Sequence, residues 1–393
     1  MLKKFKIPFA SRSHEYTERD IRCVNQVMRN AETLTQGIYL KRFESDFKNI
    51  IGGNYCFAVN SATSALELTA QLCQLKKGDE VIIPSHTYTS SAYPFIKQGA
   101  KIVWADIDLK TRVINKDTIK NCITDKTRVI VAPHLYGYCI DIPSIIKITK
   151  NQNILIVEDA AQAIGSVLKN KKAGTFGDFG IFSFHSHKNI STLGEGGMLV
   201  IKNKKYANIV PMLRHNGHTN FDFKRKNYWQ PAMGNLDLPE LRGNHLIPNN
   251  YCIGEAQSAL GSSLLKRLDK INEKKRLRAL YFMDCLKNYE SLSFHRVKSQ
   301  RHNYHLLVAL ENRGNRNLFI SKMAEEEKIQ CAVQYFPLNR YPLYQKLGFG
   351  KSNCPNADYF FDNMISFPFQ QSITDNQFEQ IIESSIRVLK NIY

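Results

Sequence analysis

Lys188 and Asp159 are the two residues whose types and spacing most directly suggest chemistry. Asp159 ends the apolar run that begins at Ile154, and Lys188 follows it by 29 residues. A lysine can form an imine with a carbonyl group, and an aspartate can keep a pyridine nitrogen protonated. An enzyme that uses pyridoxal 5′-phosphate (PLP) needs these two groups on opposite sides of its cofactor. The pair therefore suggests a PLP site.

The elements that must position this pair lie between about residues 54 and 200. Short β-branched runs predict strands at 55–59, 80–83, 101–105, 128–132, 154–157, 180–183 and 198–201. Helical patterns fill most gaps, for example at 64–75 and 142–150. This alternation is typical of a mostly parallel sheet covered on both faces, which binds ligands at the carboxyl ends of its strands. Asp159 lies at such an end, whereas Glu158 points to the other face of its strand.

A second feature of this region is the segment Asn60-Ser-Ala-Thr-Ser-Ala-Leu66, which leaves a strand and opens a helix. The backbone N–H groups of Thr63 and Ser64 can therefore face a phosphate at the positive end of that helix. Ser61 or Thr63 could also cap the helix, and the two roles are compatible.

The sequence after residue 217 is organised differently. The segment 218–249, around Tyr228-Trp-Gln-Pro-Ala-Met-Gly-Asn235, is polar. It is longer than an ordinary connection between secondary-structure elements, so we expect a functional loop. One long helix is predicted from about Gly254 into the charged 266–278 region, followed by strands at 304–308 and 329–335 and helices near 316–327 and 375–391. We expect a large domain over 1–250 and a smaller α+β domain over 251–393.

Composition restricts the class of protein. The chain has 393 residues, of which 43% are hydrophobic and 23% charged, as expected for a soluble enzyme. Its nine cysteines are scattered and include no C-x-x-C pair, which indicates neither a disulfide framework nor a zinc site. No signal peptide or membrane span is visible in the sequence. We therefore expect a cytoplasmic protein without a membrane partner.

The formal net charge of +19 raises the question of a nucleic-acid partner. The lysines are spread along the chain rather than gathered into a stripe with stacking aromatic residues, so no nucleic-acid partner is predicted. A basic field would also attract a phosphorylated substrate.

Several motifs together resemble the DegT/DnrJ/EryC1/StrS family of PLP-dependent sugar aminotransferases. They are Thr35-Gln-Gly37 with Phe43-Glu44, the Ser61-Ala-Thr-Ser-Ala-Leu66 turn, the Glu158-Asp-Ala-Ala-Gln162 strand end, the Ser183-to-Lys188 block followed by Gly194-Glu-Gly-Gly197, and Ser366-Phe-Pro368. The resemblance implies an α/β, fold-type I aminotransferase. Its large domain would hold a mostly parallel seven-stranded sheet, beside a smaller C-terminal α+β domain.

The resemblance also implies roles for individual residues. Lys188 would carry the cofactor and move the substrate proton, and Asp159 would hold the pyridinium nitrogen. The remaining contacts would come from Gln162 near the ring hydroxyl, Ser183 at the phosphate and Tyr88 stacked on the ring. Other readings stay open: Asp159 could cap a helix over 160–164, Gln162 could be an ordinary first-turn residue, and Tyr88 could belong to the core.

Two histidines flank the lysine, and some members of the family have histidine in its place and act as keto-sugar 3-dehydratases. Counting from Ser183, Lys188 and not His187 occupies the fifth following position, where the family lysine falls. Transamination is therefore preferred over dehydration. No carboxylate or cysteine stands at ligand spacing around His185 and His187, so no metal site is predicted, and we interpret both as supporting or core histidines.

The stretch Asn250-Tyr-Cys-Ile-Gly-Glu-Ala-Gln-Ser-Ala-Leu-Gly261 resembles the family segment whose asparagine reaches the cofactor phosphate of the neighbouring subunit. That implies a homodimer with shared active sites. Asn235 is a competing candidate for this role, and Asn250 could alternatively cap the helix that follows.

The chain departs from the family pattern at Cys252, where arginine is common, and at Asn339, where histidine is common. Further candidates for the acceptor pocket are His185, Arg214, His215, Asn216, Arg340 and Tyr341. The family implies L-glutamate as amino donor and a nucleotide-linked keto sugar as acceptor, for amino-sugar and surface polysaccharide synthesis. The two departures suggest a small phosphorylated ketone or a cyclitol as an alternative acceptor. A PLP-binding protein without turnover would lack the lysine, which is present here.

Overall fold

The computed structural model describes residues 5–9, 14–219, 235–297, 299 and 301–393. Its centre is a seven-stranded sheet with the order β1-β9-β8-β5-β4-β2-β3. The strands are β1 (Tyr55–Val59), β2 (Glu80–Pro84), β3 (Lys101–Ala105), β4 (Thr127–Pro133), β5 (Leu155–Asp159), β8 (Phe179–Ser183) and β9 (Gly197–Ile201). Strands β3, β2, β4, β5 and β8 run parallel, and β9 lies antiparallel to both β1 and β8. The mostly parallel seven-stranded sheet predicted from the sequence is confirmed.

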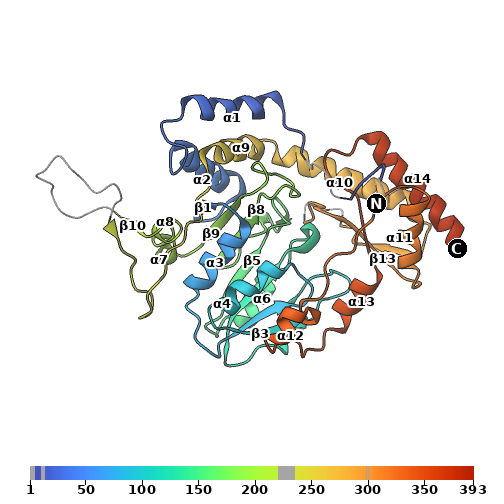
Figure 1. Cartoon of the computed structure of the whole chain (residues 1–393). Coiled ribbons are helices and arrows are strands. Elements are labelled where there is room, and N and C mark those ends of the chain that lie inside the picture. The colour runs from blue at the N-terminus through green and yellow to red at the C-terminus, as the bar shows by residue number, and fades with distance from the viewer. Residues whose placement is uncertain (1–4, 10–13, 220–234, 298, 300) are drawn as a thin grey trace, which may run out of the picture.

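Helices cover this sheet because its strands are apolar on both faces; every residue of β2, β8 and β9 is buried. In Figure 1, α3 (Ala62–Leu72) and α4 (Tyr93–Lys97) lie together over one face of the sheet, where α3 contacts β8 and β9, whereas α6 (Ile142–Thr149) contacts the short helix that follows β3. Helices α1 (Glu18–Asn30) and α2 (Ile38–Ile51) pack against α9 (Glu255–Leu265). The shorter connecting elements are α5 (Lys116–Lys120), β6 (Val167–Leu168), β7 (Lys171–Lys172), α7 (Lys204–Ala207), α8 (Val210–Leu213), β10 (His218–Thr219) and β11 (Asn235–Leu236).

The C-terminal part forms a smaller α+β unit. A three-stranded antiparallel sheet has the order β12 (Leu292–Phe294), β13 (Leu307–Glu311) and β14 (Met364–Phe367). Residues of α10 (Leu268–Cys285), α11 (Arg316–Glu325) and α14 (Asp375–Ile392) share a second hydrophobic core with it. The short helices α12 (Pro342–Lys346) and α13 (Pro355–Asn363) contribute buried residues such as Tyr344 and Phe360 to the first core.

Two predictions about this half are wrong in detail. The single long helix is two helices, because Arg267 leaves helical backbone geometry between α9 and α10 (φ −108°, ψ 0°). The predicted strand at 329–335 is absent: only Ile329 and Ala332 make isolated bridges, to Ile7 and Ser366.

The apolar alternation that suggested this strand has another cause. Ile329 and Cys331 belong to the second core, whereas Val333 and Tyr335 pack against the first. The segment is therefore a connection buried between two cores. The other predicted strand, 304–308, begins three residues later, at Leu307.

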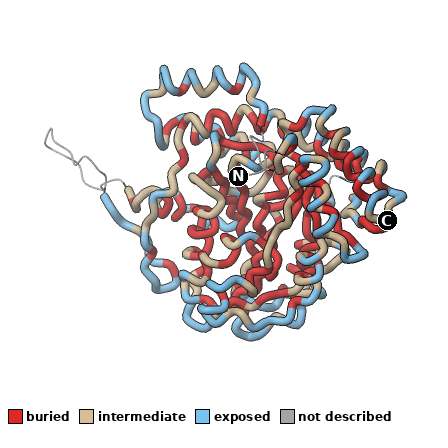
Figure 2. The backbone as a smooth tube through the Cα atoms, turned by 45° about the vertical axis from the view of Figure 1, so that its right-hand side comes forward, coloured by how far each residue is buried: buried red, intermediate tan, exposed pale blue. Residues whose placement is uncertain are grey.

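Buried residues run continuously through the middle of the molecule, and exposed ones lie on its outer helices and loops (Figure 2). The first core extends from α2 through the sheet to α9, so residues after 250 take part in it. A domain boundary at residue 250 stays a prediction. No helix in the described parts of the chain is both long enough and apolar enough to cross a membrane. The predicted loop over 218–249 is described only at its two ends, where β10 pairs with β11, and residues 220–234 lie outside the described residues.

Candidate active site

A cavity of about 440 Å³ opens at the carboxyl ends of the central strands. The parallel register places Pro133, at the end of β4, beside Asp159, and Asp159 beside β8. Strand ends that are distant in sequence therefore meet at one edge of the sheet. Of the residues predicted from the sequence, the cavity is lined by Thr63, Tyr88, Asp159, Gln162, Ser183, His185 and Lys188.

Asp159 is only 8% exposed. Its Oδ2 accepts a hydrogen bond from the Ser91 hydroxyl at 2.7 Å, and its Oδ1 accepts one from the Ala161 N–H at 3.1 Å. No helix follows, because residues after Ala160 form turns, so the alternative of a helix cap is not realised. Among the described residues no basic side chain forms an ion pair with this carboxylate. A buried carboxylate without a counter-cation fits a protonated ring nitrogen.

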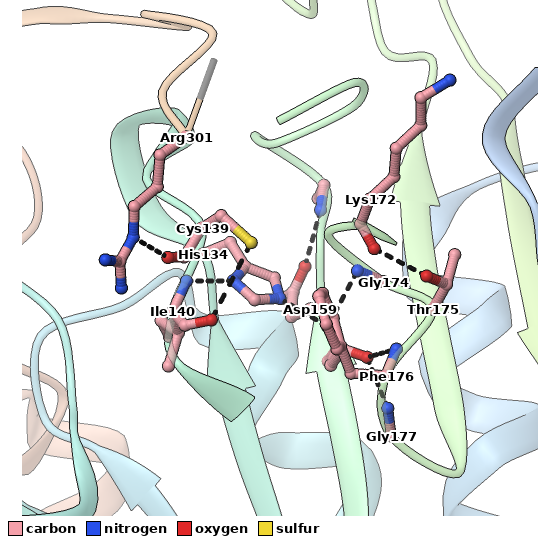
Figure 3. Close-up of polar contacts among 12 residues, drawn as sticks. His134, Cys139, Ile140, Asp159, Lys172, Gly174, Thr175, Phe176, Gly177 and Arg301 are labelled. Atoms are coloured by element: carbon pink, nitrogen blue, oxygen red, sulfur yellow. Dashed lines mark hydrogen bonds and ion pairs between the residues drawn. The ribbon is translucent and has the colours of Figure 1, made fainter. Parts of the chain in front are cut away.

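Glu158, one residue earlier, faces the opposite way, as predicted. Its carboxylate accepts hydrogen bonds from the N–H groups of Gly174, Phe176 and Gly177 at 2.6–2.8 Å (Figure 3). His134 Nε2 lies 2.9 Å from Glu158 Oε2, while His134 Nδ1 accepts the Ile140 N–H at 3.0 Å. Because Nδ1 is an acceptor, the ring proton sits on Nε2 and is donated to Glu158. This saturated network fixes the end of β5 and hence the position of Asp159.

Lys188 lies in the turn after β8, where its N–H donates to the His185 carbonyl at 2.9 Å. The residue as a whole is half-buried. Burial of its amine nevertheless lowers the pKa of Lys188 to about 8, and the negative charge of Asp159 opposes this shift. A larger share of neutral amine is thus available near neutral pH than for a lysine in water.

The expected phosphate end of the cavity lies at the start of α3. Ser61 is the N-cap of this helix, and its hydroxyl oxygen accepts the Ser64 N–H at 3.0 Å. The capping role left open in the sequence therefore belongs to Ser61. Ser61, Ala62 and Thr63 line the cavity, whereas Ser64 is buried behind them and bonded to Asn60. The contribution of the Thr63 and Ser64 amides to a phosphate stays a prediction.

Gln162 and Tyr88 border the space between these ends. The Gln162 carbonyl oxygen accepts the Tyr136 N–H at 2.7 Å, and its amide donates to the Tyr335 hydroxyl at 2.8 Å. These bonds fix the side chain, which is not on a helix. Tyr88 is 55% exposed, so it is not a core residue, and its ring centroid lies 6.0 Å from that of Tyr335.

His185 and His187 both line the cavity, with ring centroids 5.1 Å apart. Of the two interpretations offered for them, the core position does not hold, because His187 is exposed and His185 only half-buried, and a supporting role stays a prediction. Burial, His185 and Lys188 lower the pKa of His187, so it is largely neutral at pH 7. Among the described residues, no group of three or more His, Cys, Asp and Glu side chains is arranged to hold a metal ion.

Three predicted substrate residues lie away from the cavity of this chain. Arg214 is buried, with Nη1 2.6 Å from both Glu44 Oε1 and the Ala58 carbonyl. Arg340 pairs with Asp358 at 3.3 Å. Asn339 is buried and its Oδ1 has no hydrogen-bond partner among the described residues. The contacts of Arg214 and Arg340 are with other residues of the fold, and a role of any of the three in substrate binding stays a prediction.

Asn250 is exposed and also lies outside this cavity. It makes an antiparallel bridge with His215. Helix α9 begins at Glu255 with Gly254 as its N-cap, so Asn250 does not cap it. Asn235, the competing candidate, is exposed in β11 and pairs with Thr219.

Several residues of the cavity were not predicted as site residues. They come from the C-terminal half and from the end of β4: His134, Lys275, His305, Gln334, Tyr335 and Phe369. One signal was available for Lys275. It stands at helical spacing with Leu268, Ala279 and Phe282, all buried on one face of α10, which is an unusual position for a lysine.

The chain belongs to the DegT/DnrJ/EryC1/StrS aminotransferase family, whose sequence profile matches residues 14–385. It is therefore a member of a family of PLP-dependent aminotransferases, and the enzyme class and cofactor expected from Lys188 and Asp159 are confirmed. The cavity fits this cofactor, since it presents a buried lysine amine, an unpaired buried carboxylate and a helix start to one space.

The chain is similar over nearly its whole length to proteins of sugar metabolism. It is 29% identical to the spore coat polysaccharide biosynthesis protein SpsC of Bacillus subtilis (91% of each chain) and 28% identical to GDP-perosamine synthase of Vibrio cholerae (95% of this chain, 97% of the relative). The structure superposes on the putative sugar aminotransferase Spr1654 from Streptococcus pneumoniae, in its PMP form, with a TM-score of 0.87 and 27% identity, covering 99% of this chain and 100% of the other.

Two of the similar proteins have a different activity. The chain is 30% identical to a GDP-4-keto-6-deoxy-D-mannose 3-dehydratase of Escherichia coli O55:H7, over 71% of this chain and 73% of the relative. Overall similarity alone therefore does not distinguish transamination from dehydration.

Proposed function

We propose that this enzyme transfers the amino group of L-glutamate to a keto group of a nucleotide-linked sugar, for amino-sugar and surface polysaccharide synthesis. The observation that carries the proposal is the meeting of Lys188, Asp159, Gln162 and Ser183 in one cavity at the sheet edge. The name of GDP-perosamine synthase, which points to a nucleotide-linked sugar, supports the acceptor class, and the name of SpsC, a spore coat polysaccharide biosynthesis protein, supports the role in polysaccharide synthesis.

Each residue of the site has a separate role in the proposed reaction. Lys188 attaches the cofactor and then moves a proton at the α-carbon of the donor, for which its lowered pKa is suited. Asp159 holds the positive charge of the ring nitrogen. Tyr88 and Gln162 orient the ring, and Ser183 with the start of α3 binds the phosphate. Bound PLP supplies a ring that accepts the electron pair left when the α-proton departs.

The proposal includes a homodimer in which Asn250 completes the partner's site. Asn250 is exposed and away from the cavity of its own chain. Met28 near the end of α1, Leu34 in the connection and Ile38 at the start of α2 are 63–70% exposed. Exposed apolar side chains that lie close together in the chain support a subunit contact there.

Dehydration is the second candidate, because a curated 3-dehydratase is 30% identical to this chain. The position at which the family lysine falls holds Lys188, whose amine is close enough to Asp159 to feel its charge, and this favours transamination. The alternative of a small ketone or cyclitol rests on Cys252 and Asn339. Neither residue lines the cavity of this chain, so nothing in that cavity favours the smaller acceptor.

The test is a pair of half-reactions followed by absorbance. The enzyme is converted to its amine form with L-glutamate, freed of donor, and offered a panel of nucleotide-linked keto sugars, small phosphorylated ketones and cyclitol ketones. Recovery of the aldehyde form with a keto sugar supports the proposal. Recovery only with a small ketone overturns the acceptor, and release of ammonia with loss of a sugar hydroxyl identifies a dehydratase.

A further inference from the structure

A second buried lysine faces the cavity from the side of the C-terminal half. Lys275, on α10, is 6% exposed and lines the same cavity as Lys188. Its Nζ donates to the Phe369 carbonyl at 2.7 Å and lies 4.3 Å from the centroid of the Phe369 ring. The amine is thus held in place by one neutral acceptor, and an ammonium group has three donors.

The charged and titratable groups that face Lys275 are all basic. They are Arg278 on its own helix, His14 from the N-terminal segment and His305 from the segment before β13. Burial, with a contribution from Arg278, lowers the pKa of Lys275 to about 7. No carboxylate of the described residues opposes that shift. A buried lysine without a counter-ion reduces stability, so its presence in a cavity suggests a ligand.

Of the other basic groups that line the cavity, His185 lies 3.8 Å from the Glu195 carboxylate, and burial lowers the pKa of His187. Lys188 is taken by the cofactor under the proposed function, and His134 is bound to Glu158 and Ile140. Burial holds the pKa of His305 well below its usual value. No arginine is among the described residues that line the cavity. An amino-acid donor, however, always brings a carboxylate that needs a hydrogen-bonding cation in a site shielded from water.

We propose, on the basis of the transaminase function above, that Lys275 binds a carboxylate of the amino-acid donor. The two donors of its ammonium group that Phe369 leaves over would bind the carboxylate oxygens. His305 is close enough to both Lys188 and Lys275 to feel their charges, so the two lysines border one part of the cavity. The diphosphate of a sugar nucleotide is also an anion, but it is larger than a carboxylate. An amine that is nine-tenths buried therefore favours the compact carboxylate.

Binding to holoenzyme tests this without turnover. The probe is 2-methyl-L-glutamate, which has no α-hydrogen to remove, or the 2-methyl derivative of whichever amino acid converts the enzyme to its amine form. Charge-assisted hydrogen bonds contribute about 1.5–3 kcal/mol, so Lys275→Met should weaken probe binding roughly 10- to 100-fold. Lys275→Arg should recover part of the loss. Lys274→Met, which alters the exposed neighbour on the same helix, is the matched control and should bind like the wild type.

Proton uptake gives a second readout that a purely structural lysine would not change. At pH 8 an amine with a pKa of about 7 is mostly neutral, and binding an anion restores its proton. Calorimetry in two buffers of different ionisation enthalpy should show a larger proton uptake for the wild type than for Lys275→Met, by up to about 0.9 proton. Equal uptake would contradict the proposal, even if the variant bound more weakly.

A parallel titration with GDP and UDP separates the two sources of anion. Unchanged affinity for both nucleotides in Lys275→Met supports the donor assignment. If Lys275→Met binds the nucleotides more weakly but binds 2-methyl-L-glutamate as the wild type does, Lys275 binds the acceptor, and the donor assignment is wrong. Transamination by the wild type with no effect of Lys275→Met on either ligand refutes this inference alone, whereas absence of any amino-group transfer refutes the proposed function itself.

Discussion

The cavity has two walls, each with a buried lysine, and the two lysines differ in the charged groups that surround them. The sheet wall consists of Asp159, Ser183 and Lys188, and the helix wall of Lys275, His305 and Phe369. On the sheet wall the charge of Asp159 opposes the fall in the Lys188 pKa, which remains at about 8. On the helix wall Arg278 adds to the effect of burial, and the pKa of Lys275 falls to about 7. On the sheet wall a carboxylate opposes the effect of burial on the lysine, whereas on the helix wall no carboxylate of the described residues does so.

Among the changes that test this difference between the walls, removing Lys188 should have the largest effect on turnover. Lys188→Ala loses both the attachment point and the proton-transfer group, so turnover should fall at least on the order of 10³- to 10⁴-fold while the fold is retained. Borohydride reduction of the wild type should attach the cofactor to the peptide containing Lys188, as detected by mass spectrometry. Lys202→Ala, at an exposed lysine, is the control. Full activity of Lys188→Ala would refute the mechanism.

Changing the opposing charge should have the next largest effect. Asp159→Asn keeps the size of the side chain but cannot hold the ring nitrogen protonated, so turnover should fall on the order of 10²-fold or more. Cofactor absorbance should persist, because the phosphate end is untouched. We therefore expect the variant to show a lower turnover of the amino donor in kinetic assays and an unchanged cofactor absorbance. An Asp159→Asn enzyme that turns over at the wild-type rate would remove this residue from its role.

The comparison can be extended across the subunit boundary. If Asn250 serves the partner's site, mixing inactive Lys188→Ala chains with inactive Asn250→Ala chains gives hybrids in which one site carries both defects and the other none. Random exchange makes about half of the dimers hybrid, so about a quarter of wild-type activity should return. Hybrid formation is checked with two affinity tags. If hybrids form but no activity returns, Asn250 acts within its own chain.

The helix wall should also affect stability, with a smaller effect. The pKa of Lys275 is about 7 in the folded protein and 10.5 in the unfolded chain, so the unfolded state binds more protons between these values. The lysine therefore destabilises the apo-protein below about pH 10.5, increasingly as the pH falls towards 7, and by a constant amount below that.

Lys275→Met should accordingly raise the free energy of unfolding at pH 7 by about 1–3 kcal/mol, less than the pKa shift alone implies, because the Phe369 carbonyl loses its donor. The gain should shrink as the pH is raised to 9.5. Urea unfolding of both proteins at several pH values measures it. A gain independent of pH would mean that packing, not charge, is responsible.

The sequence by itself determined the sheet wall. Strand periodicity placed all seven strands of the large sheet, and the resemblance carried by Asp159, Ser183 and Lys188 identified the family, because these features depend on neighbours within a few residues. It also predicted that Glu158 and Asp159 face opposite sides, which follows from the alternation of side chains along a strand.

Only the tertiary structure decided the helix wall. Lys275 and Phe369 are 94 residues apart in the chain, and no local sequence pattern predicts the hydrogen bond between them. The same long-range packing buried the apolar segment 329–335 between two cores instead of extending it as a strand, and it turned Arg214 towards Glu44 rather than into the cavity. Local pattern determines which residues can form an element, but burial and charge at a site depend on which distant elements pack there.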